Sequence, residues 1–249
     1  MRALRILLIL VVIFGGLFVA ADRAAVYFAE GQVAEKIKSS QGLSSDPEVS
    51  IKGFPFLTQV LNSSLDEIEI GLGGVNATVD GRTIQVTEVK AVLKDVRVDS
   101  SFSSATAGQA DGSARISYAD LQQSAPKGVS VGYAGADRAA KSQVKLSGSL
   151  ADVAEGAGVT IPAPFKSLLD GEKLSVYSTV SLVNGHTVRL KAATLPTLPI
   201  PGFDSQLRDL VDYDMKIDGL PSTVKLDKVD AAETGLRFSG TGTNVSLTG

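Results

Sequence analysis

The sequence predicts an α+β protein, mostly antiparallel β, with a long helix near its N-terminus. One observation is a helical pattern that follows an apolar N-terminal segment. A second is the series of short segments beyond it, in which apolar and polar residues alternate with a period of two. A third is a hairpin signal at Asn184-Gly185, which indicates antiparallel neighbours.

The N-terminal segment has the pattern of an export signal. Arg2 and Arg5 precede an uncharged run from Ile6 to Ala21, and small residues end that run before Asp22. The run is slightly shorter than the ~20 residues that span a bilayer. We therefore expect 1–21 to be either a cleaved signal peptide or a signal anchor. Residues 22–249 would then form a single exported domain on the periplasmic side, in the cell envelope.

Asp22 to Ser39 is predicted as a helix that continues from the apolar segment. Its apolar residues fall roughly on one stripe, and Gly42 with Pro47 ends it. The stripe consists of Ala24, Tyr27, Phe28, Ala34 and Ile37.

Alternation marks the strands that follow. Ile68, Ile70 and Leu72 alternate with two glutamates, which gives a strand with one buried and one wet face. Farther along, apolar residues occupy odd positions up to Leu93 and even positions from Val96. One extra residue near Lys94-Asp95 is the simplest explanation for this change of phase, so we predict a β-bulge there.

The Asn184-Gly185 hairpin has two candidate loop lengths. A two-residue loop pairs Val180 with Arg189, which mixes apolar and polar residues on one face. A three-residue loop, 184–186, pairs Val180 with Leu190 and keeps the buried face consistent. We therefore predict the three-residue loop, with His186 in it and exposed.

Other segments give weaker signals. Phe102–Gly112 is rich in small residues and predicts a long loop or a weak edge strand. Thr160–Phe165 precedes a short amphipathic turn, Leu195–Phe203 is a proline-rich linker, and Asp204–Asp212 is a short helix. The patterns of Val49–Pro55 and Met215–Pro221 match, which reflects either chance or a duplication that places two helices against one curved sheet.

Composition excludes several functions. Without Arg2 and Arg5, 22 basic residues face 27 acidic ones, a net charge of −5, which argues against nucleic acid as a partner. The chain has no Cys, so it forms no disulfide and carries no acylated cysteine.

Catalytic and metal-binding patterns are missing from the sequence. His186 is the only His, so Ser and Thr lack the base that nucleophilic catalysis generally needs, and no cofactor is expected. Asp212, Asp214 and Asp218 form the densest acidic group, which we interpret as solvated and not as a calcium or catalytic site. We expect no catalytic residues, no metal site and no enzyme.

Two motifs carry a resemblance to a known family. Pro47–Gln59 contains the run G-F-P-F-L-T-Q, and the chain closes with Gly235-Leu236-Arg237-Phe238 through Leu247. With the N-terminal segment, these resemble the LmeA-like phospholipid-binding family of exported actinobacterial envelope proteins. The resemblance implies a curved sheet wrapped around a long N-terminal helix, similar to tubular lipid-binding (TULIP) domains. It also implies a phospholipid ligand.

We therefore expect a non-enzymatic protein that holds acyl chains in an apolar groove and supports envelope lipid or glycolipid assembly or transport. Burial of acyl chains contributes about 0.8 kcal/mol per CH₂ before costs. The predicted groove and mouth residues are Tyr27, Phe28, Phe54, Phe56, Leu57, Ile161, Phe165, Leu195, Leu198 and Phe203. Replacing Phe54 and Phe56 with Ser is expected to lower lipid retention without loss of the fold.

The alternative is an anchored envelope scaffold with a filled core, whose apolar loops dock an envelope protein such as a glycan-polymer synthase. A lipid-modifying enzyme is a third hypothesis, but the sequence offers no clear catalytic base for it. In the first two hypotheses the membrane surface is a partner.

Overall fold

The structure, a computed structural model, describes residues 2–79, 81–99, 104–125, 128–149, 152, 173–194, 208, 212–218, 220 and 222–247. The chain divides into two compact units. Unit 1 comprises Met1–Gly73, Lys90–Asp111 and Gly242–Gly249, and unit 2 comprises Gly74–Val89 and Gly112–Thr241. Each unit has its own apolar core.

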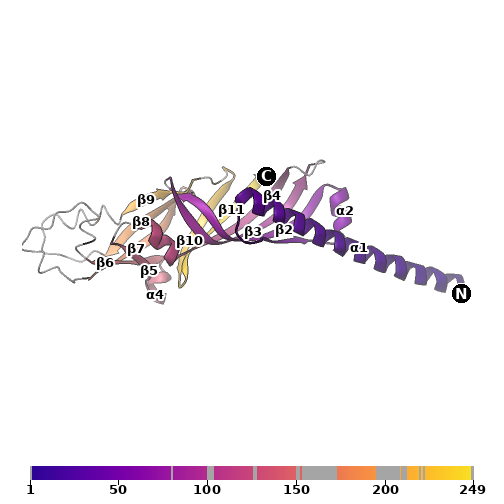
Figure 1. The fold of residues 1–249 in the computed structure, drawn as a ribbon, viewed down its shortest axis with the longest axis horizontal. Helices are drawn as coiled ribbons and strands as arrows, with labels where there is room; N and C mark the ends of the chain where they lie inside the picture. Colours follow the sequence, from indigo (N-terminus) through magenta and orange to yellow (C-terminus); the bar gives the residue numbers. More distant parts are fainter. Residues whose placement is uncertain are drawn as a thin grey trace, which may run out of the picture. The chain divides into compact units, whose positions relative to one another are not determined.

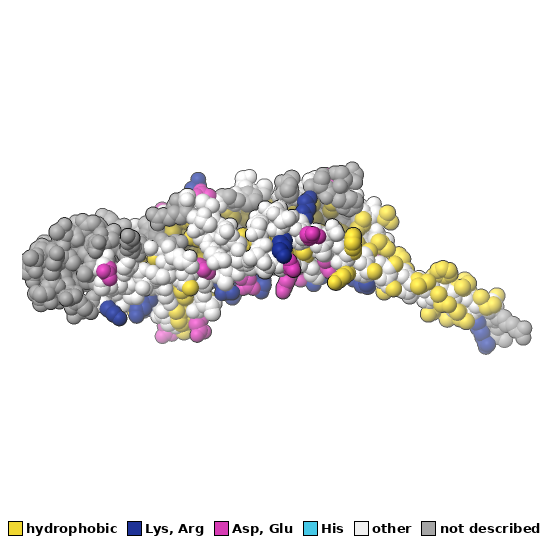
Figure 2. Space-filling model, in the orientation of Figure 1, with side chains coloured by type: hydrophobic (Ala, Val, Ile, Leu, Met, Phe, Trp, Pro, Cys, Tyr) yellow, Lys and Arg dark blue, Asp and Glu magenta, His cyan; other side chains and the backbone are white. Residues whose placement is uncertain are grey.

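A single helix, α1 (Arg2–Gln41), contains both the apolar segment and the predicted helix, as expected (Figure 1). It ends where predicted, with Gly42 at φ +60°, and the Leu43 N–H donates to Lys38 O at 3.0 Å. Within the described chain it is the one helix long and apolar enough to cross a membrane. Its large apolar side chains up to Val19 are exposed, and they dominate that half of the helix in Figure 2.

A six-stranded sheet has the order β1-β2-β3-β4-β11-β10. Its strands are β1 (Glu48–Lys52), β2 (Ser64–Val79), β3 (Arg82–Val98), β4 (Ala105–Ser117), β11 (Gly235–Ser246) and β10 (Val224–Ala232). At one edge, β1 pairs antiparallel with β2, with Ile51 opposite Ile68. The predicted strand around Ile68 is thus confirmed. A short helix, α2 (Phe56–Leu61), connects β1 to β2.

A second, five-stranded sheet lies in unit 2, with the order β5-β6-β7-β8-β9. Its antiparallel strands are β5 (Ser130–Tyr133), β6 (Gln143–Ser149), β7 (Lys173–Val183), β8 (Thr187–Thr194) and β9 (Tyr213–Lys216). Two short helices, α3 (Tyr118–Ser124) and α4 (Ala136–Ala139), accompany it. The expectation of one sheet was wrong. The matching segments lie in different sheets, where β1 and β9 are both edge strands.

The three-residue hairpin loop is confirmed. Val180 pairs with Leu190 and Leu182 with Val188 across β7 and β8. Asn184 and Gly185 both have positive φ, and the His186 ring nitrogen Nδ1 lies 2.8 Å from Asn184 O. Core burial of alternate residues therefore overrides the two-residue turn that Asn-Gly ordinarily favours.

The irregularity predicted in β3 also occurs. Leu93 and Val96 are both buried although they are three residues apart, and Asp95 between them has φ +52°. A residue in this left-handed region is typical of a bulge, which shifts the phase of the side chains by one.

The prediction for Phe102–Gly112 was wrong over its described part. Strand β4 starts at Ala105 and lies between β3 and β11, inside the sheet. Ala107 is fully buried there. Small residues have weak strand propensity, but the interior position and the neighbouring strands decide the local structure.

The two cores are separate sets of side chains. In unit 1 the core contains Val26, Ile51, Phe56, Leu65, Ile68, Leu93, Val96 and Ala107. In unit 2 it centres on Val144, Val176, Val180 and Val188. Helix α1 packs on the first of these cores through the buried Val26 and the partly buried Ala25 and Ala29. The predicted turn after Phe165, the proline-rich linker and most of the Asp204–Asp212 helix lie outside the described residues.

Candidate functional site

A groove with a volume of about 790 Å³ lies in unit 1, beside the C-terminal half of α1. Helix α1 forms one wall, and residues of β1, β2 and β3 form the rest. Its apolar lining includes Tyr27, Phe28, Ala34, Pro47, Val49, Ile70, Ala91 and Val92. The groove therefore has a mainly apolar lining built from a helix and three neighbouring strands.

Two aromatic residues of α1, Tyr27 and Phe28, are exposed in the groove lining. Tyr27 is 81% exposed and Phe28 is 69% exposed, although the residue directly before them, Val26, is buried. A helix that packs on a core ordinarily turns its large apolar residues inward. These two side chains instead line an open groove, which is the placement expected for a ligand-contacting surface.

Charged residues also line the groove. They are Glu30, Glu35, Glu48, Glu69 and Lys90. Glu30 Oε1 accepts a hydrogen bond of 2.7 Å from the Ile51 N–H of the edge strand. The carboxylate thus satisfies an edge-strand donor and fixes the helix to β1. Glu69 pairs with Lys52 at 3.0 Å.

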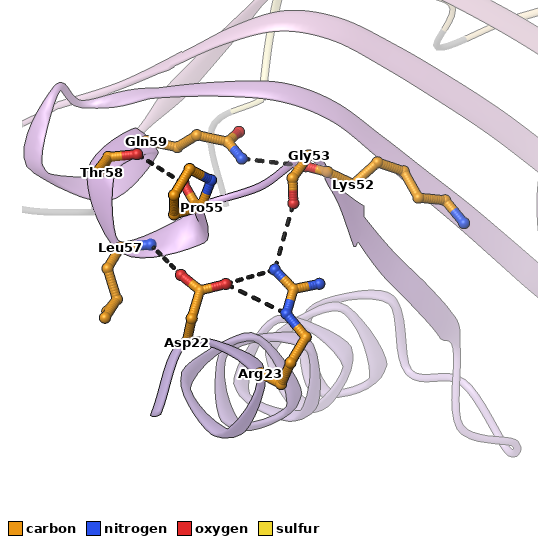
Figure 3. A network of polar contacts seen from close by, with 8 residues as sticks. All are labelled: Asp22, Arg23, Lys52, Gly53, Pro55, Leu57, Thr58 and Gln59. Atoms are coloured by element: carbon orange, nitrogen blue, oxygen red, sulfur yellow. Dashed lines mark hydrogen bonds and ion pairs between the residues drawn. The ribbon is translucent and has the colours of Figure 1, made fainter. Parts of the chain in front are cut away.

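A polar network holds α1 against α2 at Asp22 and Arg23, which precede the groove residues of α1 (Figure 3). The Asp22 side chain is fully buried, and its Oδ1 accepts a 2.9 Å hydrogen bond from the Leu57 N–H. Its Oδ2 accepts from the Arg23 guanidinium, which also reaches Gly53 O at 3.4 Å. The Arg23 guanidinium lies 5.4 Å from the centre of the Phe54 ring.

The pKa of Asp22 lies below its ordinary value. Burial by itself raises the pKa of this carboxyl. The Leu57 N–H bond, the Arg23 hydrogen bond and the Arg23 charge together outweigh burial and lower it. The folded state therefore holds Asp22 in its ionised form.

This shift predicts an acid-sensitive junction between α1 and α2. A carboxyl with a lowered folded pKa contributes stability above its unfolded pKa of about 3.9, and the contribution is lost as the pH falls through the folded value. We expect unfolding midpoints of unit 1 in denaturant to drop between about pH 5 and pH 3. In Asp22→Asn, which does not titrate, the midpoint should be lower at neutral pH and vary less over that range. Equal pH dependence of the two proteins would contradict the assignment.

The motif G-F-P-F-L-T-Q builds this junction. Gly53 has φ +96°, and a Cβ there would lie 2.6 Å from Asp66 Oδ2 and closer still to Gln59 Nε2, so only glycine fits. The buried Gln59 side chain accepts from the Asp66 N–H at 2.8 Å and donates to Lys52 O at 3.4 Å. Thr58 Oγ1 donates to Pro55 O at 2.8 Å. The motif therefore encodes the turn from β1 into α2.

The structure separates the predicted site residues into three environments. Tyr27 and Phe28 line the groove. Phe56 is buried in the core of unit 1, and Leu57 is partly buried against that core. Phe54 is 58% exposed and lies outside the groove lining. The role of these residues in lipid binding stays a prediction.

Five further predicted residues lie outside the described part of the chain: Ile161, Phe165, Leu195, Leu198 and Phe203. The sequence reasoning missed the strand residues Val49, Ile70 and Val92, together with Gly31 of the helix wall. Alternation placed Ile70 on the buried face of a strand. The sequence pattern could not predict a groove over that face, because the depth of the groove depends on the distance between the helix and the sheet.

The acidic group of unit 2 has structural partners. Asp214 forms a bidentate pair with Arg189, with both distances 2.7 Å, and this lowers the pKa of Asp214. Asp212 accepts from the Ala192 N–H, and Asp218 accepts from the Gly81 N–H at 3.4 Å. Within the described residues no three carboxylates or His side chains are grouped as a metal site.

Comparison with protein families gives one match. Residues 20–241 match the model described as LmeA-like phospholipid-binding. This range includes the groove, the α1–α2 junction and all of unit 2. No curated protein and no solved structure matches the chain.

Proposed function

The chain belongs to the LmeA-like phospholipid-binding family, and we propose that the groove of unit 1 is where it holds the acyl chains of a phospholipid. On this proposal it is a non-enzymatic protein of the cell envelope that supports lipid or glycolipid assembly or transport. The apolar half of α1, as a signal sequence or an anchor, is consistent with export.

The exposure of Tyr27 and Phe28 carries the proposal. Both aromatic residues stand on the helix wall of a groove whose other walls include Val49 and Ile70. The groove volume of about 790 Å³ falls in the range of roughly 300–1,000 Å³ that is usual for small-ligand sites. An acyl chain in the groove would cover this apolar surface, at about 0.8 kcal/mol per buried CH₂ before ordering costs.

The placement of polar groups also supports a lipid. The groove carries charged residues beside its apolar lining, so an acyl chain has an apolar surface and a headgroup has polar surroundings. The long helix beside an antiparallel sheet agrees with the tubular lipid-binding architecture that we infer for the family. The scaffold alternative with a filled core receives less support, because unit 1 contains this open volume.

The test is photo-crosslinking of the full chain in lipid nanodiscs, with a phospholipid that carries a diazirine on one acyl chain. Peptides are then identified by mass spectrometry. We expect adducts on the groove segments 27–35, 47–50, 69–71 and 90–92, in addition to adducts on the apolar half of α1.

The adducts on residues 6–21 serve as an internal reference, since that run contacts lipid whenever it is embedded in the bilayer. A large excess of unlabelled phospholipid should reduce both sets equally. Adducts confined to 6–21, with the groove segments unlabelled, would overturn the proposed function.

A further inference from the structure

Two exposed apolar side chains of unit 1, Phe54 and Leu61, lie outside the groove lining. Beyond the apolar run of α1, the described residues expose five large apolar side chains: Tyr27, Phe28, Phe54, Leu61 and Tyr133. Tyr27 and Phe28 line the groove. Phe54 and Leu61, which are 58% and 83% exposed, lie just before α2 and at its last residue. The proposed function does not use these two side chains.

The α1–α2 junction fixes the start of helix α2 to one level of α1. Leu57 N–H donates to Asp22 Oδ1 at 2.9 Å, and Arg23 reaches Gly53 O at 3.4 Å. Asp22 is the first charged residue after the uncharged run Ile6–Ala21. Helix α2 therefore lies beside α1 where its apolar half ends, as Figures 1 and 3 show.

The residues at this level have the chemistry of a membrane interface. Leu17 and Phe18 are 61% and 42% exposed at the end of the apolar run. Arg23, whose side chain is 48% exposed, stacks over the Phe54 ring, and its stem can extend along apolar surface while the charge stays in water. Aromatic and cationic side chains gather at the ends of membrane-embedded helices for this reason. The carboxylate at the same level, Asp22, is buried and paired.

We propose that Phe54, Leu61 and Arg23 form a docking surface for the lipid bilayer, continuous with the apolar half of α1. This inference rests on the proposed function and adds where the lipid enters. Tyr27 and Phe28 follow Asp22 by five and six residues, or about 7.5–9 Å along the helix at 1.5 Å per residue. With the docking surface on the bilayer, the aromatic wall of the groove begins within about 10 Å of the hydrocarbon. A phospholipid then passes from the bilayer to the groove without crossing a wide layer of water.

The absence of cysteine from the chain allows a direct test. Leu61→Cys in the full chain is labelled with a nitroxide and reconstituted into vesicles of phosphatidylcholine and phosphatidylglycerol. The collision rates of the label with oxygen and with a water-soluble nickel complex report its depth. Ser45→Cys is the matched control, because Ser45 is also exposed but follows the opposite end of α1.

We expect the Leu61 label to collide with oxygen in preference to nickel, and the Ser45 label to show the reverse. Nickel accessibility at both positions would overturn the docking proposal. So would a Leu61 label that is accessible to nickel in vesicles but shielded in native envelope membranes, since that result indicates a protein partner. Photo-crosslinking of the groove in the same Leu61→Cys protein separates the two proposals: groove adducts with an aqueous label contradict docking and leave the proposed function standing.

Discussion

Gly31→Trp is expected to abolish phospholipid binding in the groove and to leave the fold intact. Gly31 lies on the helix wall that carries Tyr27 and Phe28, and it lines the groove. Apart from its two chain neighbours and the backbone of its own helix, no atom lies within 4 Å of the position that its Cβ would occupy, so a side chain there meets open space. An indole at this position occupies the volume that an acyl chain needs.

The substitution should not cost stability. Glycine inside a helix is about 1 kcal/mol less favourable than alanine, and a larger side chain at an open position regains part of that difference. The loss of binding would therefore come from the filled groove. In the diazirine experiment, groove adducts of Gly31→Trp should fall to background, while adducts on residues 6–21 stay at the level of the wild-type protein.

Gly31→Ala is the matched control, because it gives the same gain in helix propensity but leaves most of the groove empty. Its groove adducts should remain close to those of the wild-type protein. Groove adducts that persist in Gly31→Trp would show that the acyl chain lies elsewhere. An equal loss in both variants would show that the helix conformation, and not the free volume, controls binding.

Much of the fold was predictable because it depends on period and local chemistry. Alternation gave the strand around Ile68, and the shift between Leu93 and Val96 gave the irregularity at Asp95. Consistent burial of Val180 and Leu190 gave the loop length of the hairpin. These patterns each lie within one short segment, so they can be identified from the sequence without knowledge of long-range contacts.

The predictions of the fold were wrong where contacts with distant parts of the chain determine the local structure. Residues 105–112 became an interior strand because two neighbouring strands flank them, which their own small side chains do not indicate. The second sheet likewise follows from long-range strand pairing. Of the candidate site residues, Tyr27 and Phe28 could be predicted from the apolar stripe of the helix. The strand residues of the groove could not be predicted, because whether they line a groove depends on the spacing between helix and sheet.

The motif G-F-P-F-L-T-Q shows the difficulty most clearly. Its apolar residues suggested an exposed mouth, but only Phe54 is exposed, whereas Phe56 is 6% exposed in the core and Gln59 is 8% exposed. A run of apolar side chains at a strand exit has the same composition whether it faces solvent or the interior. The direction of each side chain follows from the turn at Gly53 and from the bond between Leu57 and Asp22.

Phe56→Ala is accordingly expected to destabilise unit 1 severely, and the expectation that a double Ser replacement preserves the fold does not hold for this residue. Phe56 packs with Ile51, Leu65 and Ile68 in the core. Removing a buried phenyl ring typically costs about 3–5 kcal/mol, through lost burial and the cavity that remains. At about 1.4 kcal/mol per factor of ten, amide hydrogen exchange in β1 and β2 should accelerate by roughly two to three and a half orders of magnitude.

Phe54→Ala is the matched control two residues away. Its ring is 58% exposed and contacts the Arg23 guanidinium, so we expect a change within about 0.5–1 kcal/mol and nearly unchanged exchange in β1 and β2. Groove adducts should be lost in Phe56→Ala only in proportion to unfolding. If Phe56→Ala retained wild-type protection but lost its groove adducts, the ring would contact the lipid and not the core. Equal acceleration of exchange in both variants would indicate that Phe54 also supports the fold, which its exposure argues against.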